Sequence, residues 1–320
     1  MTAQSVCVPG GSGFVGLHLC AALARAGFRI TVPTRAPASA RHLAMIPSLR
    51  LVGADIHDSE QLARLCRGQH AVINLVGILN ERGRDGSGFR RAHADFARQL
   101  VTACRRTRVN RLLQVSALNA DPDHGASHYL RSKGMAERII REEAGADLRW
   151  TIFQPSVIFG PGDDFLNRFA RLLRIIPFCL PLARPGARLA PVWVEDVVAA
   201  LLGALADEAT AGECYQLCGP ERLTLREIVC RVRDELGLRR AIIGLPDWAA
   251  RAQAMVCDFV PGKPFSTDNY RSLLVDSVCT GNGLARLGIH PQPLAAILPR
   301  YLGDAGSAAR RFRYRQDASR

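Results

Sequence analysis

The first half of the chain alternates between short apolar, β-branched runs and longer stretches with helical periodicity. Helical patterns occur at Gly13–Gly27, Ser59–Arg67, Phe89–Arg108 and His128–Ala144. Strand-like runs separate them, and because strand and helix alternate throughout, the pattern predicts an α/β fold with a doubly wound parallel sheet. The six runs are "SVCVP", "FRITVP", "LRLVGA", "HAVINLVG", "RLLQVSA" and "RWTIFQP".

Beyond Pro155 this rhythm breaks, because prolines interrupt the pattern. We expect residues 1–160 to form the sheet domain and residues 161–300 a smaller mixed region on the substrate or partner side. The stretch "APVWVEDVVAALLGALAD" predicts a strand and helix that return to the sheet at about residues 190–207, so that the two regions interleave. We expect residues 301–320, rich in arginine, to be a flexible basic tail.

Composition adds a strong positive charge. The 320 residues carry 42 Lys and Arg against 29 Asp and Glu, a net charge of +13, which favours an anionic partner such as a phosphorylated cofactor, an acidic protein or an anionic membrane. The ten cysteines form no Cys-x-x-Cys pair, so we expect free thiols in a reducing compartment and neither a metal site nor a disulfide framework. We expect no nucleic-acid partner.

No charged-then-apolar leader precedes the first strand, which predicts a cytoplasmic chain. The segment Phe165–Ile176 places apolar residues on one side and arginines on the other. Such a basic amphipathic helix is expected to lie on an anionic membrane or a partner, which would place the chain at the cytoplasmic face of the inner membrane. The alternative is that the helix covers a substrate cleft. The sequence leaves both alternatives open.

Three glycines follow the first strand and open a helix. Gly10, Gly13 and Gly16 have the spacing of a Rossmann dinucleotide-binding turn, in which one glycine permits the turn, another admits a pyrophosphate, and the third lets helix and strand pack closely. The backbone N–H groups of Phe14, Val15 and Gly16 would then face the phosphates at the positive end of the helix dipole.

The second strand indicates which dinucleotide binds. An NAD site needs an acidic residue after this strand, where the sequence reads "TVPTRAPASAR" with no acid. Arg35, with Arg41 as a second candidate, is instead placed to meet a 2′-phosphate, so we predict NADP(H) rather than NAD(H) as the cofactor.

A possible proton-transfer site lies further along. Tyr129 and Lys133 are four residues apart on one helix face, so the ammonium is expected to lower the phenol's pKa and to touch a nicotinamide ribose hydroxyl. Ser116, at the end of the fifth strand, would hydrogen-bond the substrate oxygen.

These motifs resemble the extended short-chain dehydrogenase/reductases. "FGPGDDFLNRFA" and "DNYRSLLVDSV" are more specific, and they resemble the NADP(H)-binding accessory subunit of respiratory complex I and its bacterial relatives. The resemblance implies that Asp55 and Ile56 flank the adenine, and that Ser116, Tyr129 and Lys133 form the catalytic-type triad. It further implies that the cofactor is lined on the ribose side by Asn74, Leu75, Val76 and Gly77, and at the nicotinamide by Pro155, Ser156 and Val157. Gln154 departs from the family, where arginine is common.

Three functions remain open at this stage. The first is an NADP(H)-binding protein associated with complex I or with quinone metabolism, whose nucleotide is mainly structural, as the resemblance implies. The second is an active NAD(P)-dependent reductase or epimerase using the Ser-Tyr-Lys triad. The third is a redox-sensing nucleotide binder. The specific segments lie outside the triad, which favours the first.

Overall fold

The computed structural model describes residues 4–261 and 263–302, which fold into two units. Within these residues, unit 1 comprises residues 4–155, 197–217 and 281–289, and unit 2 comprises residues 156–196, 218–280 and 290–302. Of the predicted basic tail, residues 303–320 lie outside the described part of the chain.

Unit 1 is built on a seven-stranded sheet in the order β11-β6-β5-β4-β1-β2-β3, with every neighbouring pair parallel. This confirms the predicted doubly wound parallel sheet. The chain runs outward in opposite directions from β1 and β4, so the carboxyl ends of these neighbours form the switch point where such folds bind ligands. The strands are β1 (Ser5–Cys7), β2 (Arg29–Thr34), β3 (Leu49–Gly53), β4 (Ala71–Asn74), β5 (Arg111–Val115), β6 (Arg149–Pro155) and β11 (Glu213–Leu217).

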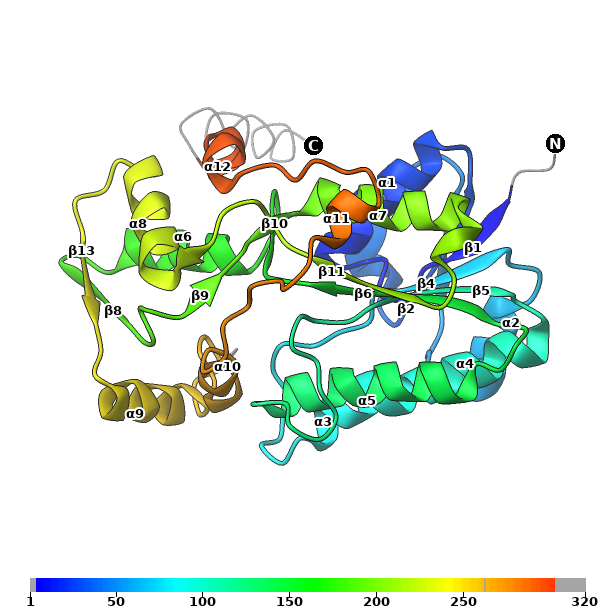
Figure 1. The fold of residues 1–320 in the computed structure, drawn as a ribbon, viewed down its shortest axis with the longest axis horizontal. Coiled ribbons are helices and arrows are strands. Elements are labelled where there is room, and N and C mark those ends of the chain that lie inside the picture. The colour runs from blue at the N-terminus through cyan, green and yellow to red at the C-terminus, as the bar shows by residue number, and fades with distance from the viewer. Residues whose placement is uncertain (1–3, 262, 303–320) are drawn as a thin grey trace. The chain divides into compact units, whose positions relative to one another are not determined.

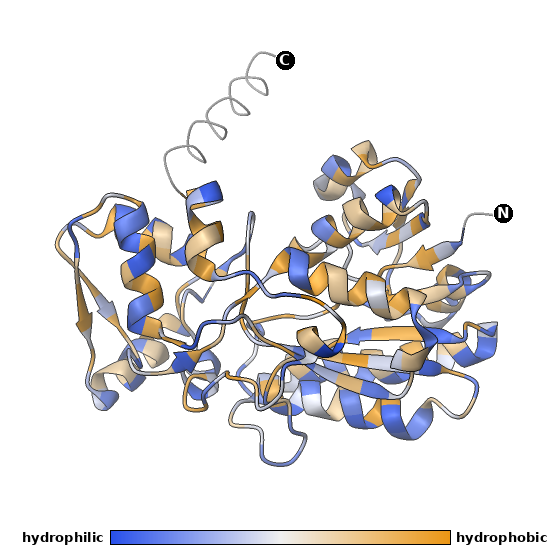
Figure 2. Cartoon of the chain, turned by 45° about the horizontal axis from the view of Figure 1, so that its top comes forward, coloured by the Kyte–Doolittle hydropathy of each residue, from blue (hydrophilic) through white to orange (hydrophobic). Residues whose placement is uncertain are grey.

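Helices cover both faces of this sheet (Figure 1). On one face α2, α4 and α5 bury an apolar core against β4, β5 and β6, with Leu62, Leu100, Ile140 and Leu112 among its members. Strands buried on both faces are rich in apolar residues, and Figure 2 shows apolar stretches along strands of this sheet. The helices of unit 1 are α1 (Phe14–Arg25), η1 (Pro37–Met45), α2 (Ser59–Cys66), α3 (Ser87–Arg90), η2 (Arg91–Asp95), α4 (Phe96–Thr107), α5 (His128–Glu143), η3 (Glu208–Thr210) and α11 (Gly283–Arg286); α7 (Val194–Ala206) begins in unit 2.

The structure differs from the predicted elements in two places. The predicted helix Phe89–Arg108 is interrupted by a π-helical turn, η2, between α3 and α4. The strand predicted within Ala190–Asp207 is β10 (Val192–Trp193), which pairs with β7 rather than with the large sheet. The strand that joins the large sheet is β11, which the alternation did not predict because β11 lies beyond Pro155, where the regular pattern breaks.

Unit 2 consists of short helices and three two-stranded sheets, β10-β7, β12-β9 and β13-β8. Leu166, Ala170 and Leu173 of α6 are buried in its core, and Phe165, Phe169 and Leu172 pack against that core. The apolar side of the predicted amphipathic helix is therefore covered by the unit itself. Its remaining elements are β7 (Ile158–Phe159), α6 (Phe165–Ile175), β8 (Cys179–Leu182), β9 (Arg188–Leu189), β12 (Leu223–Thr224), α8 (Leu225–Glu235), β13 (Ala241–Gly244), α9 (Asp247–Cys257), α10 (Thr267–Ser272) and α12 (Leu294–Leu302).

None of the helices in the described ranges has the length and apolar character that crossing a bilayer requires.

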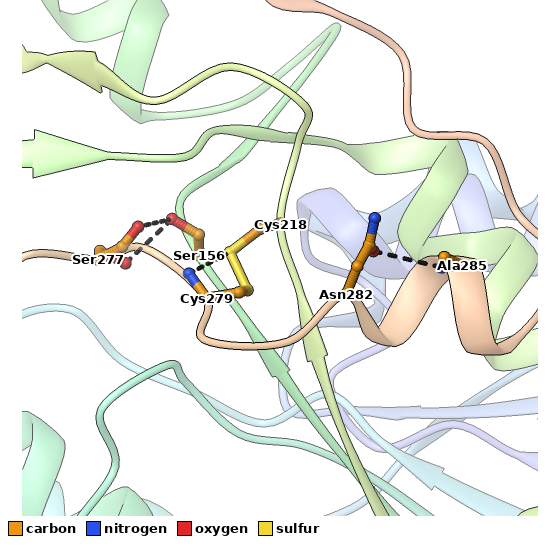
Figure 3. Close-up of a disulfide and its surroundings, with 6 residues drawn as sticks. All are labelled: Ser156, Cys218, Ser277, Cys279, Asn282 and Ala285. Atoms are coloured by element: carbon orange, nitrogen blue, oxygen red, sulfur yellow. Dashed lines mark hydrogen bonds between the residues drawn. A yellow bond between two sulfur atoms is a disulfide. The ribbon is translucent and has the colours of Figure 1, made fainter.

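A disulfide joins Cys218 and Cys279 within unit 2 (Figure 3). The expectation that all cysteines are free thiols is therefore wrong for this pair. The two residues are 61 positions apart in the sequence, so spacing gave no sign that the fold brings them together. Close by, the carbonyl oxygen of Ser277 accepts a hydrogen bond from the Ser156 hydroxyl (Figure 3). The N–H of Ser277 donates to the Arg188 carbonyl. The disulfide thus anchors the segment that pairs with β9.

We expect the Cys218→Ser/Cys279→Ser double variant to lower the free energy of unfolding of unit 2 by up to about 4 kcal/mol, because the bond restricts a long loop in the unfolded chain. Urea titration with and without a reductant measures this. Reduction should shift the native protein to the midpoint of the variant and leave the variant unchanged. An equal midpoint for all samples would contradict a structural disulfide.

Candidate functional site

The turn after β1 is shaped by backbone contacts that exclude side chains. Gly10 has a φ of +79°, and a Cβ placed on it would lie 2.7 Å from the carbonyl carbon of Leu75. A Cβ on Gly16 would lie 2.4 Å from the Gly11 oxygen, so only glycine lets α1 approach the turn this closely. Gly10 and Gly16 therefore serve the two structural roles that the spacing predicted.

Gly13 is under much weaker constraint from the protein. It has a φ of −85° and a ψ of −177°, which any residue adopts. A Cβ there would meet only the Gly10 oxygen, at 3.3 Å. The fold itself gives little reason for glycine at this position, which leaves close approach of a ligand as the reason.

The N-terminus of α1 lies at the same turn. Gly13 is its N-cap and provides no side-chain hydrogen bond, and no acidic residue occurs in the first turn. The N–H groups of Phe14, Val15 and Gly16 precede the first intrahelical donor, Leu17, which bonds to the Gly13 oxygen. A helix end with free donors and a positive dipole fits the pyrophosphate of a dinucleotide.

The ends of β2 and β3 carry the next candidates. Arg35 follows the last residue of β2 and is exposed, and Arg41 is exposed on η1. Asp55 lies beyond β3, where its carboxylate accepts a hydrogen bond from the His57 N–H at 3.0 Å, while Ile56 packs against the core of unit 1. Burial and then Arg91 lower the pKa of His57, Asp55 opposes them and Arg35 adds to them. Arg35 and Arg91 therefore both lower the pKa of His57. Arg91 was not among the site residues predicted from the sequence.

The loop after β4 is held in place by its own amide. Asn74 is buried, donates to Gln114 Oε1 at 2.8 Å and accepts from the Val76 N–H at 2.9 Å. Leu75 and Val76 lie against Gly10, and Gly77 lies beside Lys133, since a Cβ there would be 3.2 Å from Nζ. Asn74 therefore shapes the loop rather than offering its side chain to a ligand.

Helix α5 positions the tyrosine and the lysine. It begins after Ser127, whose hydroxyl caps it by accepting from the Leu130 N–H. Lys133 is buried and donates to the carbonyl oxygens of Val115 at 3.1 Å and Val76 at 3.3 Å. An ammonium has three donors, so one is left after these two bonds. Burial lowers the pKa of Lys133 to about 8, and the charge of Glu137 opposes that shift.

Tyr129 differs from the expectation. Burial raises the pKa of its phenol to about 12 and is the one cause acting on it. The predicted lowering by Lys133 does not occur in this arrangement, where the ammonium donates to the carbonyl oxygens of Val115 in β5 and of Val76 in the loop after β4. The tyrosine ring packs edge-on against His93 and Phe89, with centroids 5.6 and 6.1 Å away.

Ser116 follows β5 and is buried, with its N–H bonded to the Phe153 carbonyl. Its hydroxyl is buried and has no hydrogen-bond partner among the described residues. An unsatisfied buried hydroxyl costs free energy, so a ligand oxygen that bonds to it would remove that cost.

His93 is a residue that the sequence analysis missed. It is buried on the π-helical turn, accepts from the Ile78 N–H through Nε2 at 3.1 Å, and its Nδ1 lies 2.7 Å from Ser132 Oγ. Because Ser132 Oγ donates to the Tyr129 carbonyl, Nδ1 carries the proton. Burial, and then Lys133, hold the pKa of His93 well below its usual range, so the ring is neutral. Its place among the inward positions of the predicted helix Phe89–Arg108 was the available signal.

The last candidates lie at the end of β6. Gln154, the residue that departs from the family, donates to both carboxylate oxygens of the buried Glu137 at 2.9 Å. The Pro155 oxygen accepts from the Leu118 N–H. Ser156 and Val157 belong to unit 2, where Ser156 bonds to Ser277 and the Val157 oxygen accepts from Val192.

Comparison with known proteins identifies relatives of this chain. A family model described as NAD(P)H-binding matches residues 10–162. The chain is 30% identical over 291 residues to "NADH dehydrogenase [ubiquinone] 1 alpha subcomplex subunit 9, mitochondrial" of Arabidopsis thaliana, a match that covers 86% of this chain and 71% of that protein.

A second relative is an enzyme by name. The chain is 30% identical over 244 residues to the ceramide reductase of Caulobacter vibrioides, covering 76% of this chain and 74% of that protein. Among solved structures, a dTDP-glucose 4,6-dehydratase from Streptomyces venezuelae has a TM-score of 0.72 at 24% identity, covering 93% of this chain and 95% of that one, a likeness in fold alone. The glycine turn, the parallel sheet and these relatives together show that the chain belongs to the NAD(P)H-binding extended short-chain dehydrogenase/reductase family.

Proposed function

We propose that the chain binds NADP(H) along the carboxyl ends of β1, β2 and β4 and that the nucleotide is mainly structural, in a protein associated with respiratory complex I or with quinone metabolism. The observation that carries the proposal is Gly13, which the protein constrains far less than Gly10 or Gly16, since a Cβ there would make one tight contact, with the Gly10 oxygen at 3.3 Å. Close approach of a phosphate would account for the glycine. Phe14, Val15 and Gly16 supply backbone donors to the pyrophosphate. Arg35 meets the 2′-phosphate, and Asp55 and Ile56 border the adenine.

The ribose next to the nicotinamide would be held by Lys133. Its remaining N–H donor suits a ribose hydroxyl, and Gly77 beside it has no side chain to press against Nζ. Asn74, Leu75 and Val76 act through the backbone, since they set the path of the loop that passes Gly10. Pro155, Ser156 and Val157 stay proposed neighbours of the nicotinamide.

A structural role for the nucleotide is supported by Tyr129. A proton donor works best with a pKa near the working pH, and burial moves the pKa of Tyr129 away from it, to about 12. A relative whose match covers 86% of the chain is named as a subunit of a mitochondrial NADH dehydrogenase [ubiquinone]. We therefore place this protein with such subunits, with complex I subunits or an anionic membrane surface as its partners.

A reductase is the second candidate, favoured by the unsatisfied hydroxyl of Ser116. In that case the bound nicotinamide supplies hydride to a carbonyl carbon. Ser116 would hold the carbonyl oxygen by a hydrogen bond, Tyr129 would donate the proton to that oxygen, and the charge of Lys133 would stabilise the phenolate that remains. The ceramide reductase of Caulobacter vibrioides is a relative with this kind of name.

The Gly13→Ala variant should lose affinity for NADPH by at least about ten-fold, because a methyl group there obstructs the bond between the helix N–H groups and a phosphate, worth about 1.5–3 kcal/mol. Its thermal midpoint should stay close to that of the native protein. Gly203→Ala is the matched control, since Gly203 lies on α7 with nothing within 4 Å of its Cβ position. Calorimetry that finds equal affinities for native protein and Gly13→Ala would contradict the site.

NADPH should bind more tightly than NADH, and Arg35→Ala should remove most of that difference, a loss of roughly 10- to 150-fold, because it deletes a charge-assisted contact to the 2′-phosphate. Arg25→Ala, which removes an exposed arginine at the far end of α1, is the control and should change neither affinity. Equal binding of both nucleotides by the native protein refutes the choice of cofactor.

Tyr129→Phe separates the two candidate functions. With a structural nucleotide, NADPH affinity should stay within about two-fold of native, because the ring still packs against His93 and Phe89. Lys133→Ala should weaken binding in either case. NADPH oxidation is measured with a panel of carbonyl compounds and quinones, and we expect no turnover by the native protein. Robust turnover that falls by roughly 10²–10⁴-fold in Tyr129→Phe would establish the reductase instead.

A further inference from the structure

The β8–β13 ribbon of unit 2 has one covered face and one open face. Leu180, Leu182 and Ile242 point into the core of the unit. In the register of the two strands Ile243 lies opposite Pro181, and Ala241 lies opposite Cys179. Pro181, Ala241 and Ile243 are exposed, so the outward face is apolar as well. Figure 2 shows β13 as a hydrophobic strand. Two-stranded ribbons that face water on one side normally carry polar residues there.

Large apolar side chains are also exposed at both ends of the ribbon. Phe178, which directly precedes β8, is 82% exposed, and Ile175 at the end of α6 is 77% exposed. The Phe178 oxygen accepts from the Ala241 N–H, which ties this end to β13. At the other end, a two-residue link leads from β13 to α9, where Trp248 is 75% exposed.

Helix α9 extends the apolar surface. Ala250 and Ala254 are its buried residues, whereas the larger Met255 and Val256, seven and eight positions after Trp248, are exposed. That spacing places Trp248, Met255 and Val256 on one helix face. A helix that packs with alanines and presents tryptophan and methionine outward is typical of a surface that contacts an apolar environment.

Arginines border the ribbon without neutralising partners. Arg174 precedes Ile175, and Arg239 lies two residues before β13; both are exposed, and in the ranges that the structure describes neither forms an ion pair. Of the acidic residues nearby in the sequence, Asp164 pairs with Arg168 and Arg171, and Asp234 pairs with Arg233. The rim of the apolar surface is therefore positively charged.

We propose that this surface, formed by Arg174, Ile175, Phe178, the outward face of β8–β13, Arg239 and Trp248, docks on an anionic lipid bilayer. The exposed side chains of Ile175, Phe178 and Trp248 enter the headgroup region of the bilayer, where tryptophan is favoured. Arg174 and Arg239 bind lipid phosphates. The docking is peripheral. It rests on the anionic membrane partner named under the proposed function and not on nucleotide binding. The sequence left Phe165–Ile176 open between a membrane or partner contact and a cover for the substrate cleft. In the structure the apolar side of α6 packs in the core of unit 2, and Ile175 at its C-terminal end is exposed.

Flotation of the full chain with vesicles tests the proposal. Vesicles of phosphatidylcholine alone are compared with vesicles that contain about one third phosphatidylserine, at low salt and at high salt. We expect binding to the anionic vesicles, weakened at high salt because exposed charges are screened. Lipids brominated near the headgroup should quench Trp248 fluorescence, and Trp248→Phe should bind while losing that quenching.

Two variants separate the two contributions to binding. Ile175→Ser/Phe178→Ser should abolish bromine quenching and weaken vesicle binding at least ten-fold. Arg174→Gln/Arg239→Gln should weaken binding about 25-fold, from roughly five-fold for each arginine. The matched controls Met45→Ser and Arg64→Gln/Arg67→Gln alter exposed residues of unit 1 and should bind as the native protein does. Circular dichroism spectra and thermal midpoints, equal in all of them, verify folding.

Three outcomes would overturn the proposal. The first is native protein that stays unbound on anionic vesicles, and the second is binding that the unit 1 controls weaken as much as the ribbon variants do. The third is a concentration-dependent dimer that Ile175→Ser/Phe178→Ser dissociates, with no vesicle binding, which would assign the surface to a second copy of the chain.

Discussion

The contact between the β1–α1 turn and the end of β4 is the constraint on which the candidate site depends. A Cβ on Gly10 would lie within 3 Å of the backbone of Leu75 and Val76, so the two loops can meet only where one of them lacks a side chain. Because the sheet is parallel, the N-terminus of α1, the turn after β2 and the loop through Gly77 lie at one edge of it. The nucleotide proposal follows from this arrangement, because the backbone N–H donors of α1 suit a pyrophosphate by their position and not by their number.

Burial sets the chemistry of the neighbouring side chains. Lys133, His93 and Tyr129 lie close together in unit 1, and for each of them burial is the main cause of the pKa shift. The result is a neutral imidazole, a phenol with a raised pKa and an ammonium turned toward two backbone carbonyls. Such a cluster suits a ligand that is held by hydrogen bonds. Proton transfer from Tyr129 would need the pKa of its phenol to fall again when a ligand binds.

In unit 2, large apolar residues lie both in the core and on the surface. Helix α6 directs its leucines and phenylalanines inward, and the Cys218–Cys279 bond fixes the segment that pairs with β9. The ribbon β8–β13 and helix α9 bury small or medium side chains and leave Phe178 and Trp248 outside. Apolar content alone therefore did not identify the exposed surface, since α6 is the more obviously amphipathic segment.

The sequence by itself determined the parallel sheet, its first six strands, the glycine turn and the absence of an acid after β2, because these depend on local periodicity and on spacing within a few residues. The tertiary structure decided what depends on residues distant in the chain. It brought Cys218 to Cys279, added β11 to the sheet, and placed His93 against Tyr129 and Lys133. It also turned Lys133 toward the carbonyls of Val76 and Val115 rather than the phenol, because a buried ammonium must satisfy its donors with the acceptors that the packed strands place within reach.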